Sequence, residues 1–230
     1  MQATAFFTRR RAPLLAIAAL LVAALVGASL AGHHRSRAQA AAPVVVSGPA
    51  HHTEWARSVD PSINLFQMSP VLYRSGLPSD DRDVQLKALG VRSVVSFIKD
   101  DDREWVKDPS IRLYSQPMHA DRVTDDEILQ ALRTVRAAQA QGPVLIHCKH
   151  GNNRTGIVAA MYRITFDGWS REAALAEMQN NGFGSEDDMT DAVEYLEQAD
   201  VDAIRVALAN GSPCAHGMSW CGVKEQLGML

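Results

Sequence analysis

The chain reads PVLIHCKHGNNRTG over residues 143–156, an apolar run that leads directly into a polar loop. The apolar side chains of residues 144–147 do not alternate with polar ones, which is typical of a central parallel strand covered by helices on both faces. A helix is expected to follow over residues 155–166. A loop between a buried strand and a helix N-terminus is the place where open α/β sheets bind ligands.

The segments around this loop alternate between strand and helix patterns. The expected strands are a short one opened by Tyr73 and Arg74, then residues 91–98, 111–118 and 144–147. The expected helices begin at Ser79, at the capping box of Thr124 and Glu127, at Thr155, at Ser170 and at Ser185, the last being long and containing Val201. This order predicts the α/β class, with a central, mostly parallel sheet of about four to five strands flanked by helices.

The loop has the features of a phosphate-binding site. A loop that enters a helix N-terminus directs several free backbone N–H groups into one cavity, and the helix dipole adds partial positive charge there. Gly151 permits the tight turn, and Arg154 offers a planar fork of donors to two phosphate oxygens. The expected substrate-binding residues are Lys149, His150, Gly151, Asn152, Asn153 and Arg154.

Cys148 is the expected nucleophile of this loop. The field that holds a phosphate also stabilises a thiolate, the reactive form of cysteine. Attack on phosphorus would give a cysteinyl-phosphate, and Thr155 is placed to donate a hydrogen bond to the sulfur when it later departs. His147, directly before the nucleophile, is expected to orient the loop from beneath.

The stretch HCKHGNNRTG, residues 147–156, resembles the signature of the protein tyrosine phosphatase superfamily, which has a His, a Cys, five loop residues, an Arg and a Ser or Thr. The resemblance extends over about residues 73–208 and is closest to small dual-specificity-like bacterial phosphatases. It implies the cysteine-phosphatase fold and hydrolysis of phosphate monoesters without a metal or another cofactor. The implied substrate is a phosphorylated protein or a small phosphate ester.

The resemblance also implies an Asp general acid on an upstream loop, which protonates the leaving oxygen and later activates water. Asp121 follows a strand end and precedes the helix cap, so it is the expected acid. Asp125 and Asp126 are expected to lie in the first helical turn, where the helix dipole favours acidic residues. Asp125 remains the alternative acid.

Lys149 and His150 leave the substrate open. Similar basic residues occur in family members that act on inositol phosphates or phosphoinositides, so a phosphatase of those compounds is an alternative function. The two side chains are equally compatible with solvated loop positions. Phosphotyrosine, phosphoserine or phosphothreonine, lipid and inositol phosphates all remain candidate substrates.

Other classes of function fit less well. A non-enzymatic phosphate-binding module is expected to lack the Cys, the Arg or the acid, and sulfur-transfer or arsenate-reducing loops resemble this one less. A metal site built from His147, Cys148 and His150, with His119 or His216, is disfavoured because Arg154 would place positive charge beside the cation. The net charge of −3 gives no indication of nucleic-acid binding.

The N-terminus reads as an export signal. Three arginines precede the apolar run of residues 12–31, and small-residue cleavage patterns follow at residues 29–31 and 38–40. The run is also near the lower end of the length needed to span a bilayer, about 17 to 25 residues, so an anchor in an inner membrane is the alternative. The expected organisation is a signal peptide or signal anchor (1–40), a tether (41–63), a phosphatase domain (64–210) and a C-terminal tail (211–230), in the periplasm or otherwise outside the cytoplasm.

The three cysteines bear on this location. Cys214 and Cys221 are close enough in sequence to pair, which would leave Cys148 as the lone thiol in an oxidising compartment. Both tail cysteines being reduced is an equally open reading, since sequence alone does not fix their geometry.

Overall fold

The computed structural model describes residues 53–79, 82–184 and 189–229, which all belong to one compact unit, residues 46–230. The expected signal segment, most of the tether and Ser185 lie outside these residues. Among the described residues, no helix has both the length and the apolar character needed to cross a bilayer.

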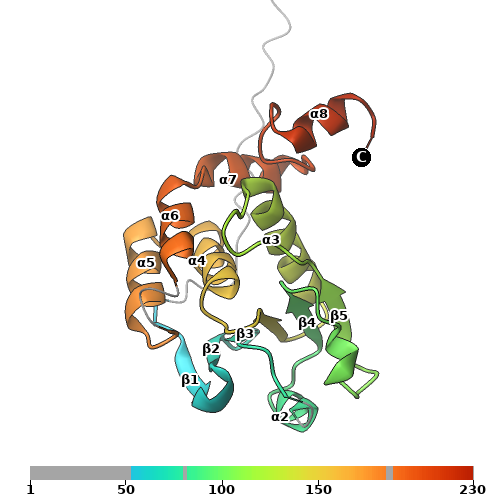
Figure 1. Cartoon of the computed structure of the whole chain (residues 1–230), viewed down its shortest axis with the longest axis vertical. Coiled ribbons are helices and arrows are strands. Elements are labelled where there is room, and N and C mark those ends of the chain that lie inside the picture. The colour runs from blue at the N-terminus through green and yellow to red at the C-terminus, as the bar shows by residue number, and fades with distance from the viewer. Residues whose placement is uncertain (1–52, 80–81, 185–188, 230) are drawn as a thin grey trace, which may run out of the picture. The chain divides into compact units, whose positions relative to one another are not determined.

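One mixed sheet of six strands organises this unit (Figure 1). In chain order the strands are β1 (Arg57–Asp60), β2 (Leu65–Ser69), β3 (Leu72–Ser75), β4 (Ser93–Ser96), β5 (Arg112–Ser115) and β6 (Val144–His147). Their spatial order is β1-β2-β3-β6-β4-β5, with β3, β6, β4 and β5 parallel and the β1–β2 and β2–β3 pairs antiparallel. His147 is in register with both Ser75 and Ser96, so three strands end together beside the loop that follows β6.

The fold class is confirmed, but the strand count is higher than expected. Two N-terminal strands, β1 and β2, are missing from the sequence-based expectation, and β1 occupies residues 57–60 of the expected tether, so this part of it belongs to the sheet. In β1 no side chain is fully buried, as is typical of an edge strand, so it carries little apolar pattern. In β2, four of the five residues are buried, which hides the alternation that identifies a half-exposed strand.

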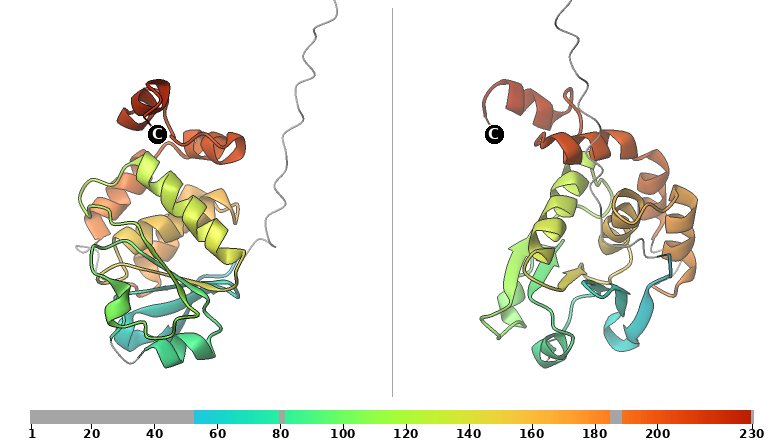
Figure 2. Two further views of the ribbon diagram at one scale, coloured as in Figure 1. Left: turned by 90° about the vertical axis from the view of Figure 1, so that its right-hand side faces the viewer. Right: turned by 180° about the vertical axis from the view of Figure 1, so that it is seen from behind.

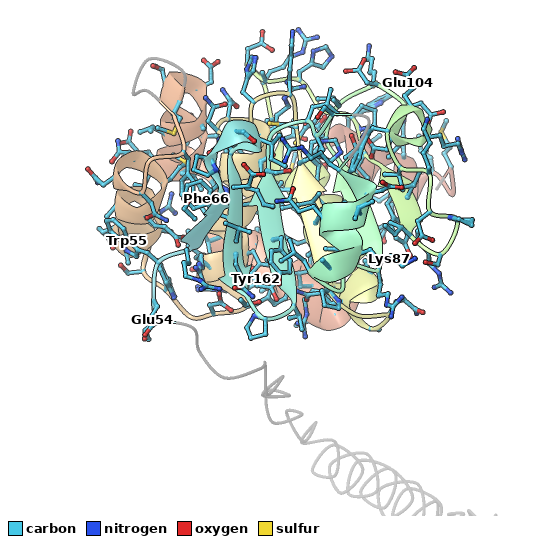
Figure 3. All side chains as sticks on the ribbon, turned by 90° about the horizontal axis from the view of Figure 1, so that it is seen from below. Glu54, Trp55, Phe66, Lys87, Glu104 and Tyr162 are labelled. Carbon is cyan, nitrogen blue, oxygen red and sulfur yellow. A yellow bond between two sulfur atoms is a disulfide. The ribbon has the colours of Figure 1, made fainter. Side chains whose placement is uncertain are left out.

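Helices cover both faces of the sheet. They are α2 (Asp83–Ala88), α3 (Asp125–Gln139), α4 (Arg154–Thr165), α5 (Arg171–Asn180), α6 (Thr190–Gln198), α7 (Val201–Asn210) and α8 (Trp220–Gln226), with short 3-10 turns at Pro61–Ile63 and Asp102–Glu104. Helices α3 to α7 lie on one side and α2 on the other, where it is seen in front of the sheet from below (Figures 2 and 3). The strands contribute to two hydrophobic cores. One core contains Leu72, Val95 and Ile146, and the other contains Tyr73, Val94 and Leu145.

Two of the expected helix starts are found as predicted, one is displaced, and one expected helix is divided in two. The capping box of Thr124 and Glu127 is present, and Ser170 caps α5. Helix α2 begins after Arg82 rather than at Ser79. The long C-terminal helix is in fact two helices, because Asp200 accepts a hydrogen bond from the amide of Ala203 and so caps a new start.

The C-terminal tail is structured. It contains α8, and Cys214 and Cys221 form a disulfide seven residues apart in sequence. Cys148 is the free cysteine. The pairing that the sequence left open is therefore present.

Candidate active site

The loop after β6 depends on a glycine at its centre. Gly151 has a φ of +84°, in the left-handed region, and a Cβ added there would lie 2.5 Å from the backbone nitrogen of Gly76. No other residue fits this position without moving the backbone of β3's end. Helix α4 then begins at Arg154, one residue from the predicted start.

Three consecutive carbonyls of the loop are bonded to the segment around β3. Leu77 N donates to Lys149 O at 3.1 Å, Asn64 Nδ2 to His150 O at 2.9 Å and Arg74 Nη2 to Gly151 O at 2.7 Å. In a trans peptide the N–H points opposite to the C=O. These bonds therefore turn the amides of residues 150–152 away from β3, into the concave side of the loop.

Cys148 lies at the base of that concave side. Its side chain is buried, and its Sγ accepts a hydrogen bond from the amide of Gly151 at 3.3 Å. The sulfur is thus bonded by one of the backbone amides that the sequence assigns to phosphate. The structure therefore brings Cys148 and the amide of Gly151 together.

Arg154 and Thr155 begin α4 beside the cysteine. Arg154 Nη1 lies 3.4 Å from Phe97 O and 3.5 Å from Met118 O, both long hydrogen bonds, and its Nε is buried without a partner. The guanidinium therefore keeps donors for an anionic ligand. Thr155 Oγ1 is also buried and unpartnered, so the predicted bond to Cys148 is not formed in this structure.

His147 is held by an acidic residue that sequence reasoning missed. Its Nε2 lies 3.1 Å from the Asp102 carboxylate, and Trp105 Nε1 donates to the same carboxylate at 3.0 Å. All three side chains are buried. Asp102 stands in a run of acidic residues in the sequence, so no local signal separates it from its exposed neighbours Asp100 and Asp101.

Asp121 lies on the loop before α3, as expected. It is exposed and borders a cavity of about 360 Å³, which is also lined by Asp191, Glu194 and Tyr195 of α6. The cavity lining does not include Cys148 or Arg154. The loop nevertheless starts at Met118, whose carbonyl contacts Arg154.

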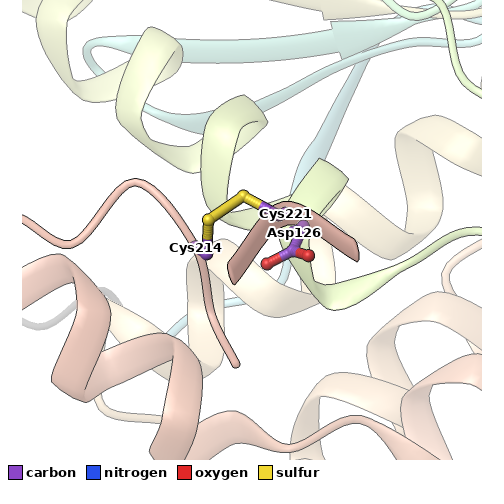
Figure 4. A group of neighbouring side chains, drawn as sticks. All are labelled: Asp126, Cys214 and Cys221. Atoms are coloured by element: carbon purple, nitrogen blue, oxygen red, sulfur yellow. A yellow bond between two sulfur atoms is a disulfide. The ribbon is translucent and has the colours of Figure 1, made fainter. Parts of the chain in front are cut away.

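Asp125 and Asp126 have a role beyond the helix dipole, because they hold the C-terminal half of the chain. Asp125 accepts hydrogen bonds from Tyr195 Oη at 2.7 Å and pairs with His216 Nε2 at 2.8 Å. Burial and then this carboxylate raise the pKa of Tyr195, and the bond to Asp125 raises the pKa of His216. Asp126 accepts from the amide of Ala215 at 2.6 Å, next to the disulfide (Figure 4). Asp125 and Asp126 are thus engaged in structural contacts, whereas Asp121 is exposed, so Asp121 is the better candidate for the general acid.

The remaining loop side chains divide by exposure. Lys149 and His150 are exposed, whereas Asn152 is buried and its Oδ1 accepts from the Asn153 amide at 2.9 Å. The first two are free to meet a ligand, and Asn152 shapes the loop. A cluster that could hold a metal is formed by Asp126, Cys214 and Cys221, but its two sulfurs are joined in the disulfide.

Comparison with known proteins agrees with this geometry. The family model described as the tyrosine phosphatase family matches residues 61–211. The dual specificity protein phosphatase TpbA of Pseudomonas aeruginosa is 54% identical over 206 residues, which is 90% of this chain and 91% of the relative. An inositol diphosphatase of Arabidopsis thaliana is 28% identical over 68% of this chain and 80% of its own.

Two solved structures are similar in backbone as well. A variant of TpbA in complex with phosphotyrosine has a TM-score of 0.66 and 59% identity, over 68% of this chain and 97% of that one. The core catalytic domain of a PP-IP phosphatase from S. cerevisiae, in complex with citrate, has a TM-score of 0.53 and 26% identity, over 67% and 96%.

Proposed function

The chain belongs to the tyrosine phosphatase family, and on that basis we propose that it removes phosphate from phosphorylated proteins, phosphotyrosine included, through a cysteinyl-phosphate on Cys148. It is a cysteine-dependent phosphoric monoester hydrolase. The observation that carries the proposal is the Cys148 sulfur, bonded to the Gly151 amide beneath a loop that ends at Arg154.

The residues divide the reaction into two steps. The Cys148 thiolate attacks phosphorus while the ester P–O bond breaks, and Asp121 gives its proton to the departing oxygen. Water then attacks the phosphoryl group, Asp121 takes a proton from that water, and the S–P bond breaks to return the thiolate and free phosphate. Thr155, with its unpartnered hydroxyl, is the donor available to the sulfur as it leaves.

Two observations bear on the substrate. The relative with 54% identity is named a dual specificity protein phosphatase, and a structure of that protein contains phosphotyrosine, which supports a phosphoprotein substrate. Lys149 and His150 are exposed on the loop, and an inositol diphosphatase is 28% identical, which supports an inositol phosphate as the second candidate. The higher identity favours the phosphoprotein.

Steady-state hydrolysis tests both candidates. Rates on p-nitrophenyl phosphate, phosphotyrosine and phosphoserine peptides and inositol hexakisphosphate are compared for the parent, Cys148→Ser, Asp121→Asn and Lys149→Ala, with a metal chelator present. We expect no turnover by Cys148→Ser and slow turnover by Asp121→Asn. If Lys149→Ala slows hydrolysis of the inositol phosphate alone, the second candidate is favoured. Unaltered hydrolysis by Cys148→Ser would reject the mechanism.

We also propose that the protein is exported to the periplasm, with residues 1–40 as a cleaved signal or, through residues 12–31, as a membrane anchor. The disulfide between Cys214 and Cys221 supports this proposal, because such bonds persist in oxidising compartments. Cell fractionation of the full chain and of a chain lacking residues 1–40 tests it. Export of only the full chain is expected, with its tail thiols oxidised. Equal cytoplasmic recovery of both would contradict it.

A further inference from the structure

Arg74 is a fully buried arginine directly behind the loop. It lies in β3, beside β6, and only 1% of its surface is exposed. Its guanidinium is stacked on the ring of Phe183, with Cζ 3.6 Å from the ring centre. A Cβ on Gly156, in the first turn of α4, would lie 3.8 Å from Arg74 Nη2, so the guanidinium also touches the start of that helix.

Arg74 is connected to the nucleophile Cys148 by two hydrogen bonds that share one residue, Gly151. Arg74 Nη2 donates to the carbonyl of Gly151 at 2.7 Å, and the amide of the same Gly151 donates to Cys148 Sγ at 3.3 Å. Gly151 is in a left-handed conformation, and because glycine reaches many other conformations as easily, contacts are needed to hold it there. The arginine thus fixes the residue whose N–H supports the sulfur.

The charge of Arg74 interacts with both Glu177 and the cysteine of the loop, Cys148. The two buried carboxylates on this side of the sheet, Asp167 and Glu177, form ion pairs with the other buried arginine, Arg163, at 3.0 and 2.9 Å. Burial lowers the pKa of Arg74 to about 10, an effect that attraction to Glu177 and to Cys148 partly opposes. The attraction is mutual, so a positive Arg74 favours a negative sulfur.

We propose that Arg74 is a positioning residue of this phosphatase: it holds Gly151 in place under the Cys148 sulfur and contributes a buried positive charge that favours the thiolate. The inference rests on the proposed role of Cys148 as nucleophile. It assigns Arg74 no contact with the substrate.

The test follows the thiolate directly. The rate of Cys148 alkylation by iodoacetamide is measured across pH, with the modified peptide quantified by mass spectrometry, in the parent, Arg74→Met, Arg74→Lys and Arg163→Met. Arg74→Met keeps an unbranched side chain but removes the charge and the bond to Gly151, so the midpoint of alkylation is expected to rise by about one pH unit or more. Arg74→Lys keeps the charge without the planar fork, so a smaller rise is expected.

Arg163→Met is the matched control, because Arg163 is equally buried but its hydrogen bonds go to Asp167, Glu177 and the backbone of Glu54. It is expected to lower stability without moving the midpoint. An unmoved midpoint in folded Arg74→Met, or an equal rise in Arg163→Met, would overturn the inference. If Arg74→Met does not fold, the test uses Arg74→Lys, and an unmoved alkylation midpoint in that variant would overturn the inference.

Activity separates this inference from the proposed function. Turnover of p-nitrophenyl phosphate by Arg74→Met is expected to fall at least tenfold at pH 6 and to recover partly as pH rises and the thiolate forms. A midpoint shift in variants of a parent that hydrolyses no phosphate ester would keep the positioning role and reject the phosphatase proposal.

Discussion

His147, one residue before the nucleophile, has its Nε2 3.1 Å from the buried carboxylate of Asp102. Asp100, Asp101 and Glu104 in the same loop are exposed, whereas Asp102 is buried. The Trp105 ring lies edge-on to the His147 imidazole, with 5.8 Å between the ring centres. The carboxylate therefore ties a surface loop to the end of β6. A proton on Nε2 lets His147 donate to this carboxylate, because a carboxylate only accepts.

Asp102→Asn is expected to lower both stability and activity. The asparagine side chain can still accept a hydrogen bond from Trp105, but the buried bond between His147 and a charged carboxylate is lost. The free energy of unfolding should therefore fall by about 1–3 kcal/mol. Urea denaturation and kcat/KM on p-nitrophenyl phosphate measure the two effects. Asp100→Asn, which removes the same charge from an exposed position in the same loop, is the control. Equal behaviour of the two variants would show that the buried pair has no role.

Gly151→Ala is expected to abolish activity. Its Cβ would lie 2.5 Å from Gly76 N, so either the loop or the end of β3 must move, and the amides that face Cys148 move with it. Gly182→Ala is a matched control, since Gly182 has a φ of +80° and nothing within 4 Å of its added Cβ. That control should cost only the backbone penalty of about 1–2 kcal/mol. Hydrolysis rates and thermal unfolding distinguish the two, and a fully active Gly151→Ala would contradict the loop geometry.

Loss of the disulfide should loosen the tail before the core. In the Cys214→Ser, Cys221→Ser double variant, the tail keeps its contacts with Asp125 and Asp126 but loses a crosslink over seven residues, which is worth about 2 kcal/mol in a short loop. Amide hydrogen exchange of α8 is expected to accelerate, with β6 and α4 unchanged. Unaltered exchange in α8 would mean that the contacts alone hold the tail.

The same tail should respond to pH through His216. Its bond to Asp125 raises its pKa in the folded protein above the ordinary value of 6.5. The interaction is therefore complete below about pH 6.5 and is lost as pH rises through the raised pKa. The imidazole titration, followed by NMR, should show the elevated value, and Asp125→Asn should return it toward normal. A midpoint for His216 at or below 6.5 would contradict the ion pair.

Short-range patterns predicted much of this molecule. The strand at residues 144–147, the capping box of Thr124 and Glu127 and the loop from Cys148 to Arg154 are each specified by neighbours in sequence. The same holds for the α/β class, since strands and helices alternate along the chain.

What the sequence did not reveal depends on distant partners. Arg74 and Gly151 are 77 residues apart, and Asp102 and His147 are 45 apart, so nothing local marks either pair. Strand β2 gains its place by pairing with β3, and β1 by pairing with β2, rather than by an apolar pattern of their own. The contacts of Asp125 and Asp126 with the tail were hidden for the same reason, because helix-end acids look alike whether or not they bind another segment.

The most direct test of the account is to trap the phosphoryl group on Cys148. With p-nitrophenyl phosphate the leaving group needs no proton, so Asp121→Asn should form the cysteinyl-phosphate readily and hydrolyse it slowly. Rapid acid quench followed by mass spectrometry of the peptide that contains Cys148 measures it. The account predicts a phosphoryl group on Cys148 that accumulates within one turnover. Release of nitrophenol at full rate with no phosphoryl group on Cys148 would contradict it.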